Sequence, residues 1–179
     1  HSGDFKLDPT PIDGLETDLR RFAAYGEEGV MLLLSDSTNS IVEGYSRSES
    51  VVGKTLEGVF AGAKGRIVIT TFASHIHRIQ QINDCARKVG RKVFLVGRSL
   101  VDNVETAERL GWIHFPRDAR PGHNKPMDES PSKIVVITTG TQGEPSSALA
   151  RIAFDEHRGV QVEPGDLVII SARTIPGNE

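Results

Sequence analysis

The stretch RIVITTFASHIHRIQQINDCARKV (Arg66–Val89) decides the fold, because its hydrophobic pattern changes halfway along. Its first part, Arg66–Phe72, is a nearly continuous apolar run, which is typical of a strand covered on both faces in a parallel sheet. Its second part, Ile76–Val89, places Ile79, Ile82 and further apolar residues on one stripe of a helix. A strand that leads directly into an amphipathic helix is the repeating unit of α/β proteins.

The same alternation recurs along the chain. Buried strands are predicted at 29–34, 66–72, 92–97, 133–139 and 166–171, and helices at 49–61, 76–89, 99–110 and 146–154. This alternation predicts an α/β fold, namely a three-layer Rossmann-like domain with a mainly parallel sheet and right-handed crossovers. The segment 114–132 holds four prolines and is expected to form a loop.

Composition limits the classes of function. The 179 residues suffice for one domain with a sizeable core, and the formal net charge of −3 argues against a surface covered with phosphate-binding cations. Contact with nucleic acid would therefore be local, in a groove or pocket. The single cysteine, Cys85, excludes an internal disulfide and suits a reducing compartment. Because no apolar run is long enough to span a membrane, we expect a cytoplasmic protein without a membrane partner, and the start at His1 favours an excised fragment.

Small hydroxyl and glycine residues follow the predicted strands. They lie at 35–39, 72–78, 140–145 and 172–179. In open α/β sheets, ligands bind at the carboxyl ends of the strands, where such residues let a phosphate approach the backbone closely. The pattern therefore favours a phosphate-bearing ligand. The alternative is that these residues only cap the helices that follow, which is their commoner role.

Two glycine-containing strings do not indicate a nucleotide cofactor. The string VGKT (Val52–Thr55) would need glycine in place of Ser48 to complete a P-loop, and it lies inside a predicted helix. The string GTQGEP (Gly140–Pro145) lacks the glycine spacing of a dinucleotide-binding fingerprint. Neither string supports binding of ATP or NAD.

A few charged residues are candidates for a functional site. Asp4 supplies hard oxygen ligands and could bind a divalent metal ion, but one ligand makes no site. Asp36 directly follows an apolar run and could orient a metal-bound water, or it could simply form an Asx turn. Arg78, Arg98 and Arg173 each follow a strand end and could pair with phosphate oxygens, or form surface ion pairs.

Five segments, in this order along the chain, together resemble the ribonuclease J family. They are SGDFKLDPTPIDG at 2–14, LLSDSTN at 33–39, TTFASHIHRIQQI at 70–82, TGTQGEPSSALARIA at 139–153 and IPGNE at 175–179. The resemblance implies a β-CASP domain inserted in a metallo-β-lactamase fold. It assigns residues 1–14 to the end of the first metallo-β-lactamase segment, 15–171 to the β-CASP domain and 172–179 to the return.

The resemblance also implies roles for particular residues. Asp4 matches a ligand that bridges two metal ions, and Asp36 matches a catalytic acidic residue of the β-CASP domain that supports the metal centre. Further residues would face the RNA and its 5′-phosphate, namely Ser35, Ser37, Ser74, His77, Arg78 and Ser171. The remaining metal ligands would lie outside this chain. His75 and Ala172 depart from the family pattern, where asparagine and a second serine are usual.

The implied activity is hydrolysis of RNA phosphodiesters at two divalent metal ions, zinc or manganese, without a nucleotide cofactor. The resemblance implies 5′-to-3′ exonuclease action on 5′-monophosphorylated RNA, with endonuclease action as a second mode. The expected partners are single-stranded RNA, the flanking metallo-β-lactamase domain and further copies of the complete enzyme, and the fragment alone is expected to be inactive. Two alternatives are a stand-alone Rossmann-like module that binds a nucleotide or sugar phosphate, and a purely structural domain.

Overall fold

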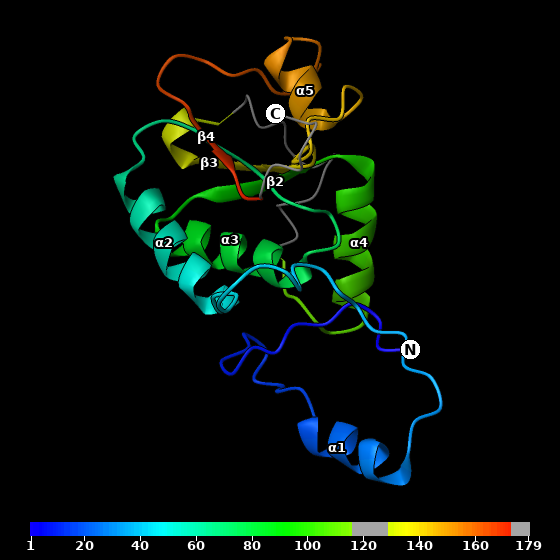
Figure 1. The fold of residues 1–179 in the computed structure, drawn as a ribbon. Helices are drawn as coiled ribbons and strands as arrows, with labels where there is room; N and C mark the ends of the chain where they lie inside the picture. The colour runs from blue at the N-terminus through cyan, green and yellow to red at the C-terminus, as the bar shows by residue number, and fades with distance from the viewer. Residues whose placement is uncertain (116–128, 173–179) are drawn as a thin grey trace. The chain divides into compact units, whose positions relative to one another are not determined.

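The computed structural model describes residues 1–115 and 129–172 (Figure 1). Contacts divide the chain into two compact units, His1–Val52 and Gly53–Glu179. The whole sheet belongs to the second unit. The domain limits predicted after residues 14 and 171 are not tested by this division and stay a prediction.

Within 53–115 and 129–172, the second unit is built on a parallel sheet of four strands in the order β2-β3-β1-β4. The strands are β1 (Ile67–Thr70), β2 (Lys92–Val96), β3 (Ile134–Thr138) and β4 (Leu167–Ile170). Ile67 pairs with Val135 on one side and with Leu167 on the other. Because all neighbours run parallel, the strands end at one common edge. The predicted α/β fold with a parallel sheet is confirmed.

Helices lie on both faces of this sheet. Figure 1 shows α3 (Ile76–Lys88) and α4 (Arg98–Arg109) on one face, and α5 (Ala148–Ala153) on the other. Between α5 and the sheet lies a cluster of buried apolar residues, formed by Val68, Phe94, Ile134, Val136, Ile152 and Val160. The continuous apolar runs seen in the sequence are explained by this covering, since every residue of β1 and β3 is buried.

The helix α2 (Glu49–Gly62) contains the string VGKT, which confirms that this string is not a P-loop. Its residues Leu56 and Phe60 are buried in the second unit. The thiol of Cys85, on α3, lies 3.8 Å from the carbonyl oxygen of Gly53. Burial raises the pKa of the Cys85 thiol, so this cysteine is a packing residue rather than a reactive one.

A buried ion pair joins the beginnings of β1 and β4. Arg66 and Asp166 have side chains only 2% and 3% exposed, and the guanidinium lies 3.6 Å from the carboxylate. The same carboxylate accepts a hydrogen bond from the backbone N–H of Arg66 at 3.2 Å, and the guanidinium donates to the carbonyl of Gln161. These contacts fix the register of the edge strand β4, whose apolar residues Val168 and Ile170 are exposed.

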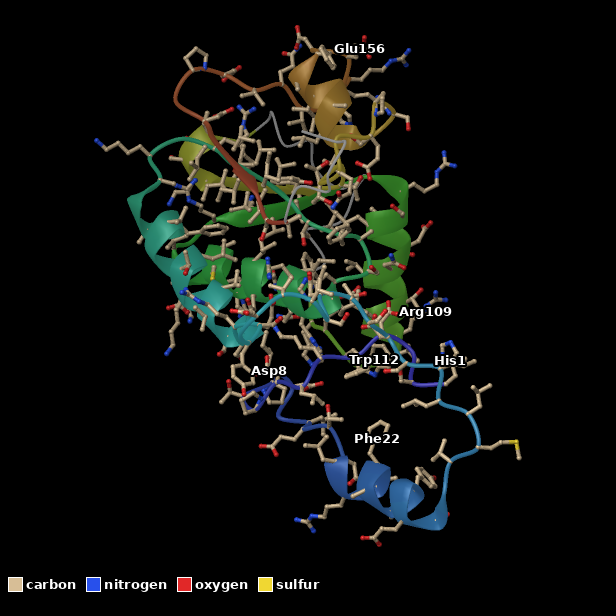
Figure 2. The ribbon with its side chains drawn as sticks, in the orientation of Figure 1. His1, Asp8, Phe22, Arg109, Trp112 and Glu156 are labelled. Carbon is tan, nitrogen blue, oxygen red and sulfur yellow. The ribbon has the colours of Figure 1, made fainter. Side chains whose placement is uncertain are left out.

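The first unit contains the helix α1 (Leu19–Glu28), which the sequence reasoning missed. The side chain of Asp18 caps this helix by accepting a hydrogen bond from the backbone N–H of Arg21 at 3.1 Å. None of the residues of α1 is buried, and Phe22 projects from it (Figure 2). A polar cluster elsewhere in this unit holds Asp8, which accepts hydrogen bonds from the backbone N–H groups of Thr10 and Glu49.

The prediction of a buried strand at 29–34 is wrong. The structure has no strand there, and residues 30–34 are all more than half exposed. A parallel strand needs a hydrogen-bonded neighbour, and in the described part of the chain the backbone of this run accepts one hydrogen bond, from the N–H of Ser2 to the carbonyl of Leu34. An apolar run alone therefore did not suffice to make a strand.

Parts of some predictions fall on residues that the structure does not describe. These are residues 116–128 of the expected loop and residues 173–179, which include Arg173 and the segment IPGNE. Within 1–115 and 129–172, no helix has the length and apolar character needed to cross a membrane.

Candidate metal and phosphate site

The first unit brings the segment that carries Asp4 against the segment that carries Asp36. The backbone N–H of Ser2 donates to the carbonyl of Leu34 at 2.9 Å. The hydroxyl of Ser2 accepts a hydrogen bond from the backbone N–H of Asp36 at 3.0 Å and donates to the carbonyl of Gly3 at 2.7 Å. Two sequence motifs that are far apart in the chain are thus hydrogen-bonded to each other.

The carboxylate of Asp36 is held by several donors. It accepts hydrogen bonds from the backbone N–H of Thr38 at 2.9 Å and from the hydroxyl of Thr38 at 2.7 Å, which is the Asx turn considered from the sequence. The backbone N–H groups of Phe5 and Ser37 make smaller contributions that also lower its pKa. These hydrogen bonds, that of the Thr38 backbone first, lower the pKa of Asp36, so the group is ionised at neutral pH.

Asp4 lies two residues after Ser2 in the chain and is exposed. Gly3 before it has φ +64°, a conformation that favours glycine. Among residues 1–115 and 129–172, none donates a hydrogen bond to the Asp4 carboxylate in the structure, so its oxygens are available to a ligand. Hard carboxylate oxygens fit one position of a divalent metal site.

The described residues do not complete a metal site around Asp4. Within 1–115 and 129–172, no three histidine, cysteine, aspartate or glutamate side chains are grouped closely enough to hold an ion. Asp4 therefore fits as one ligand of a site whose other ligands come from elsewhere. Ser35 and Ser37 flank Asp36 on the same loop and are exposed, and the hydroxyl of Ser35 donates to the carbonyl of Asp36 at 3.1 Å.

The second unit brings together two other predicted residues at the carboxyl edge of the sheet. The guanidinium of Arg78, in the first turn of α3, donates to the hydroxyl of Ser171 at 2.5 Å and lies 3.4 Å from its carbonyl oxygen. The backbone N–H of Ser171 donates to the carbonyl of Thr70 at 2.9 Å. Arg78 is thereby fixed at the point where β1 and β4 end.

Ser74 and His77 lie beside this pair along the chain and are exposed. Ser74 is in the turn between β1 and α3, where the backbone N–H of His75 donates to the carbonyl of Phe72 at 3.0 Å. His75 occupies the N-cap position of α3, and its side chain makes no capping hydrogen bond. Because α3 follows β1 directly, it begins at the same edge of the sheet as Arg78.

Buried threonines at the strand ends were not singled out from the sequence. Thr70 ends β1 and Thr71 follows it. Both are fully buried, and their hydroxyl oxygens have no hydrogen-bond partner among the described residues. Thr138 ends β3, and its carbonyl accepts the backbone N–H of Thr71 at 3.1 Å. The signal that could have identified these residues is the string VITT, which ends both strands.

The loop GTQGEP after β3 shows the alternative role of strand-end residues. Ser147 caps α5 by accepting a hydrogen bond from the backbone N–H of Ala150 at 3.1 Å. Gly140 has φ +112°, and a Cβ atom there would lie 2.4 Å from the Ser147 hydroxyl oxygen. The glycine is therefore needed for close packing against the cap of α5, independently of any ligand.

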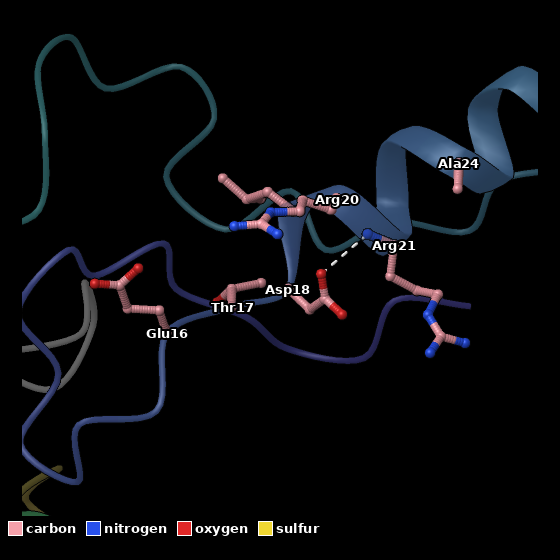
Figure 3. Close-up of a pocket in the computed structure, with 7 residues that line it drawn as sticks. Glu16, Thr17, Asp18, Arg20, Arg21 and Ala24 are labelled. Carbon is pink, nitrogen blue, oxygen red and sulfur yellow. Dashed lines mark hydrogen bonds between the residues drawn. The ribbon is translucent and has the colours of Figure 1, made fainter.

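A surface hollow of about 640 Å³ lies at the start of α1 (Figure 3). It is lined by charges of both signs, among them Glu16, Asp18, Arg20 and Arg21. Asp18 is occupied as the cap of α1, and none of the predicted site residues lines this hollow. Because charges of both signs line it, this hollow does not indicate any one class of ligand.

Comparison with known proteins identifies the family of this chain. The chain is 49% identical to a ribonuclease J of Helicobacter pylori, 46% identical to that of Corynebacterium glutamicum and 45% identical to that of Mycobacterium tuberculosis, in each case over its whole length. It spans 26%, 25% and 32% of those proteins. A family model described as the beta-CASP domain of ribonuclease J matches residues 64–179. The chain therefore belongs to the ribonuclease J family.

Proposed function

We propose that this chain is part of a metal-dependent ribonuclease that removes nucleotides from the 5′ end of 5′-monophosphorylated RNA and also cuts internally. The observation that supports the proposal most directly is the arrangement of Asp4 and Asp36, because Asp4 is exposed while the backbone of Asp36 is hydrogen-bonded to Ser2, two residues before Asp4. The curated relatives carry the name Ribonuclease J, which supports RNA as the substrate class.

In this proposal Asp4 binds metal, and Asp36 acts on Asp4 rather than on the substrate. The backbone N–H of Asp36 donates to the hydroxyl of Ser2, so Asp36 helps to restrict the position of the segment that carries Asp4. Two bound divalent ions, zinc or manganese, would supply activation of water and stabilisation of the attacking and leaving oxygens of the phosphodiester. The remaining ligands would come from the flanking metallo-β-lactamase domain, so the isolated fragment is inactive.

Arg78 and Ser171 are the residues best placed in the second unit to bind phosphate. A guanidinium suits phosphate oxygens because its N–H donors form a planar fork. Ser171 fixes this guanidinium at the carboxyl edge of the sheet, where α3 also begins. Ser35, Ser37, Ser74 and His77 are exposed polar residues that we assign to the same single-stranded RNA substrate. The complete enzyme would act as a homo-oligomer in the cytoplasm.

The test of the metal assignment is Asp4→Ala in the full-length protein. We expect metal-dependent cleavage to fall by at least about a hundredfold, because one ligand of the site is lost, while the circular dichroism spectrum is unchanged. Glu43→Ala is the control, since Glu43 is an exposed carboxylate of the same unit. Normal turnover by the Asp4 variant would remove Asp4 from the metal site.

A further inference from the structure

Ser2 is the residue that makes the most contacts between the two motifs of the first unit. Its backbone N–H binds Leu34, its hydroxyl oxygen accepts the N–H of Asp36, and its hydroxyl proton is donated to Gly3. Ser2 is half-buried, whereas Asp4 is exposed. Neither the composition nor the spacing of the sequence gives this serine a role.

Ser2 anchors the segment that carries Asp4 on its N-terminal side. The backbone N–H of Asp36 donates to the Ser2 hydroxyl at 3.0 Å, and the backbone N–H of Ser2 donates to the carbonyl of Leu34 at 2.9 Å. Only Gly3 lies between Ser2 and Asp4, so both hydrogen bonds act close to the proposed metal ligand.

This anchoring matters because Gly3 is a glycine, the residue type with the greatest backbone freedom. Its φ of +64° is readily accessible to glycine, and a Cβ atom there would meet nothing within 4 Å, so neighbouring side chains do not restrain it. A metal ligand must be held within a fraction of an ångström of its productive position. Loss of the anchor at Ser2 would let the backbone at Gly3 rotate and move the Asp4 carboxylate.

We propose that Ser2 is a positioning residue that holds Asp4 ready to bind metal, by keeping Asp36 in place through its hydroxyl. The inference rests on the proposed role of Asp4 as a metal ligand. Removing the hydroxyl leaves the N–H of Asp36 without its acceptor and frees one end of the Gly3–Asp4 segment. Supporting residues of this kind change metal affinity by roughly 10-fold to 100-fold when they are lost.

The test compares Ser2→Ala, Ser2→Thr and Asp4→Ala in the full-length protein, with Ser46→Ala as the matched control. Ser46 is an exposed serine of the same unit. The first readout is the affinity for Mn²⁺, measured by calorimetry on protein that has been stripped of metal. The second is hydrogen exchange of the Asp36 amide in the stripped protein. The third is the separation of kcat from KM on 5′-phosphorylated RNA.

We expect Ser2→Ala to weaken Mn²⁺ binding by about tenfold or more, to speed exchange of the Asp36 amide, and to lower kcat with little change in KM. Ser2→Thr keeps the hydroxyl and should restore all three values, and Ser46→Ala should match the unmodified protein. If Ser2→Ala does not fold, Ser2→Cys replaces it, since a thiol has similar size and accepts hydrogen bonds poorly.

Unchanged Mn²⁺ affinity in Ser2→Ala, while Asp4→Ala loses binding, would overturn the role of Ser2 and leave the metal site intact. A Ser2→Thr variant as weak as Ser2→Ala would also overturn it, because the hydroxyl would then not be the cause. If Asp4→Ala itself binds Mn²⁺ normally, the proposed function fails first, and the inference about Ser2 fails with it.

Discussion

Gly140 shows how a single residue can serve packing where the sequence pattern indicates a ligand. Its φ of +112° is a conformation that residues with a side chain rarely adopt. A Cβ atom there would also lie 2.4 Å from the Ser147 hydroxyl oxygen and 2.9 Å from the Cβ of Leu149. The unfavourable φ and the steric clash act together, because the Gly140 backbone cannot move without disturbing the cap of α5.

We therefore expect Gly140→Ala to lower the free energy of unfolding by about 1–3 kcal/mol. The loss can be read from native-state hydrogen exchange of the β3 amides. Gly58→Ala is the matched control, because Gly58 lies within α2 with open space around it. Alanine there should stabilise the helix by about 0.5–1 kcal/mol. A neutral Gly140→Ala would show that the loop tolerates a side chain.

The candidate site could be predicted only in part from the sequence, for a reason visible at Asp36. An aspartate after an apolar run indicates an Asx turn, and the turn is present. The link from Asp36 to Ser2 joins backbone and hydroxyl groups of distant segments, and such contacts follow no periodicity. The roles assigned to Asp4, Ser35, Ser74 and His77 come from the family resemblance and stay predictions.

At the scale of elements, strands were predicted correctly where the strands that pair with them are among the described residues. The runs at 66–72 and 133–139 became β1 and β3, with each strand shorter than its run by two or three residues. The run at 29–34 has the same apolar signature, but no described strand pairs with it. The helix α1 was missed because no strand precedes it, so the alternation did not point to it.

The edge strand β4 depends on the buried pair of Arg66 and Asp166. Arg66→Ala would leave the Asp166 carboxylate, only 3% exposed, without its cation. We expect this change to lower the free energy of unfolding by about 3–5 kcal/mol. Native-state hydrogen exchange of the β1 and β4 amides provides the measurement. Lys88→Ala is the contrast, because its pair with Glu57 is exposed to solvent and should contribute little to stability. Equal effects of the two changes would contradict a special role for burial.

At the scale of the whole molecule, charge limits how RNA can be bound. With a formal net charge of −3, the chain has no general excess of positive charge, so the proposed binding of RNA would depend on a few placed cations. We propose the guanidinium of Arg78, fixed by Ser171, as one of them. The logarithm of RNA affinity falls linearly with the logarithm of salt concentration. Each contact with a phosphate of single-stranded nucleic acid contributes about 0.7 to the size of that slope.

Arg78→Ala in the full-length protein should therefore reduce this slope by about 0.7, and it should weaken binding of 5′-phosphorylated RNA more than that of 5′-hydroxyl RNA. Titrations at several salt concentrations provide the measurement. Arg109→Ala is the control, since Arg109 ends α4 (Figure 2), and a helix that follows β2 ends at the opposite edge of the sheet. An unchanged slope in the Arg78 variant would exclude Arg78 from phosphate contact.

The strand order β2-β3-β1-β4 also has a consequence for how the protein is made. β1 leaves the ribosome before both of its neighbours, and the neighbours Val135 and Leu167 of Ile67 are synthesised much later. This largely apolar strand must therefore stay unpaired at least until Val135 has been translated. Pairing over such sequence distances is slow, and exposed strands of this kind aggregate. The growing chain is accordingly a natural client for chaperones, and slower translation beyond residue 70 would prolong its most vulnerable interval.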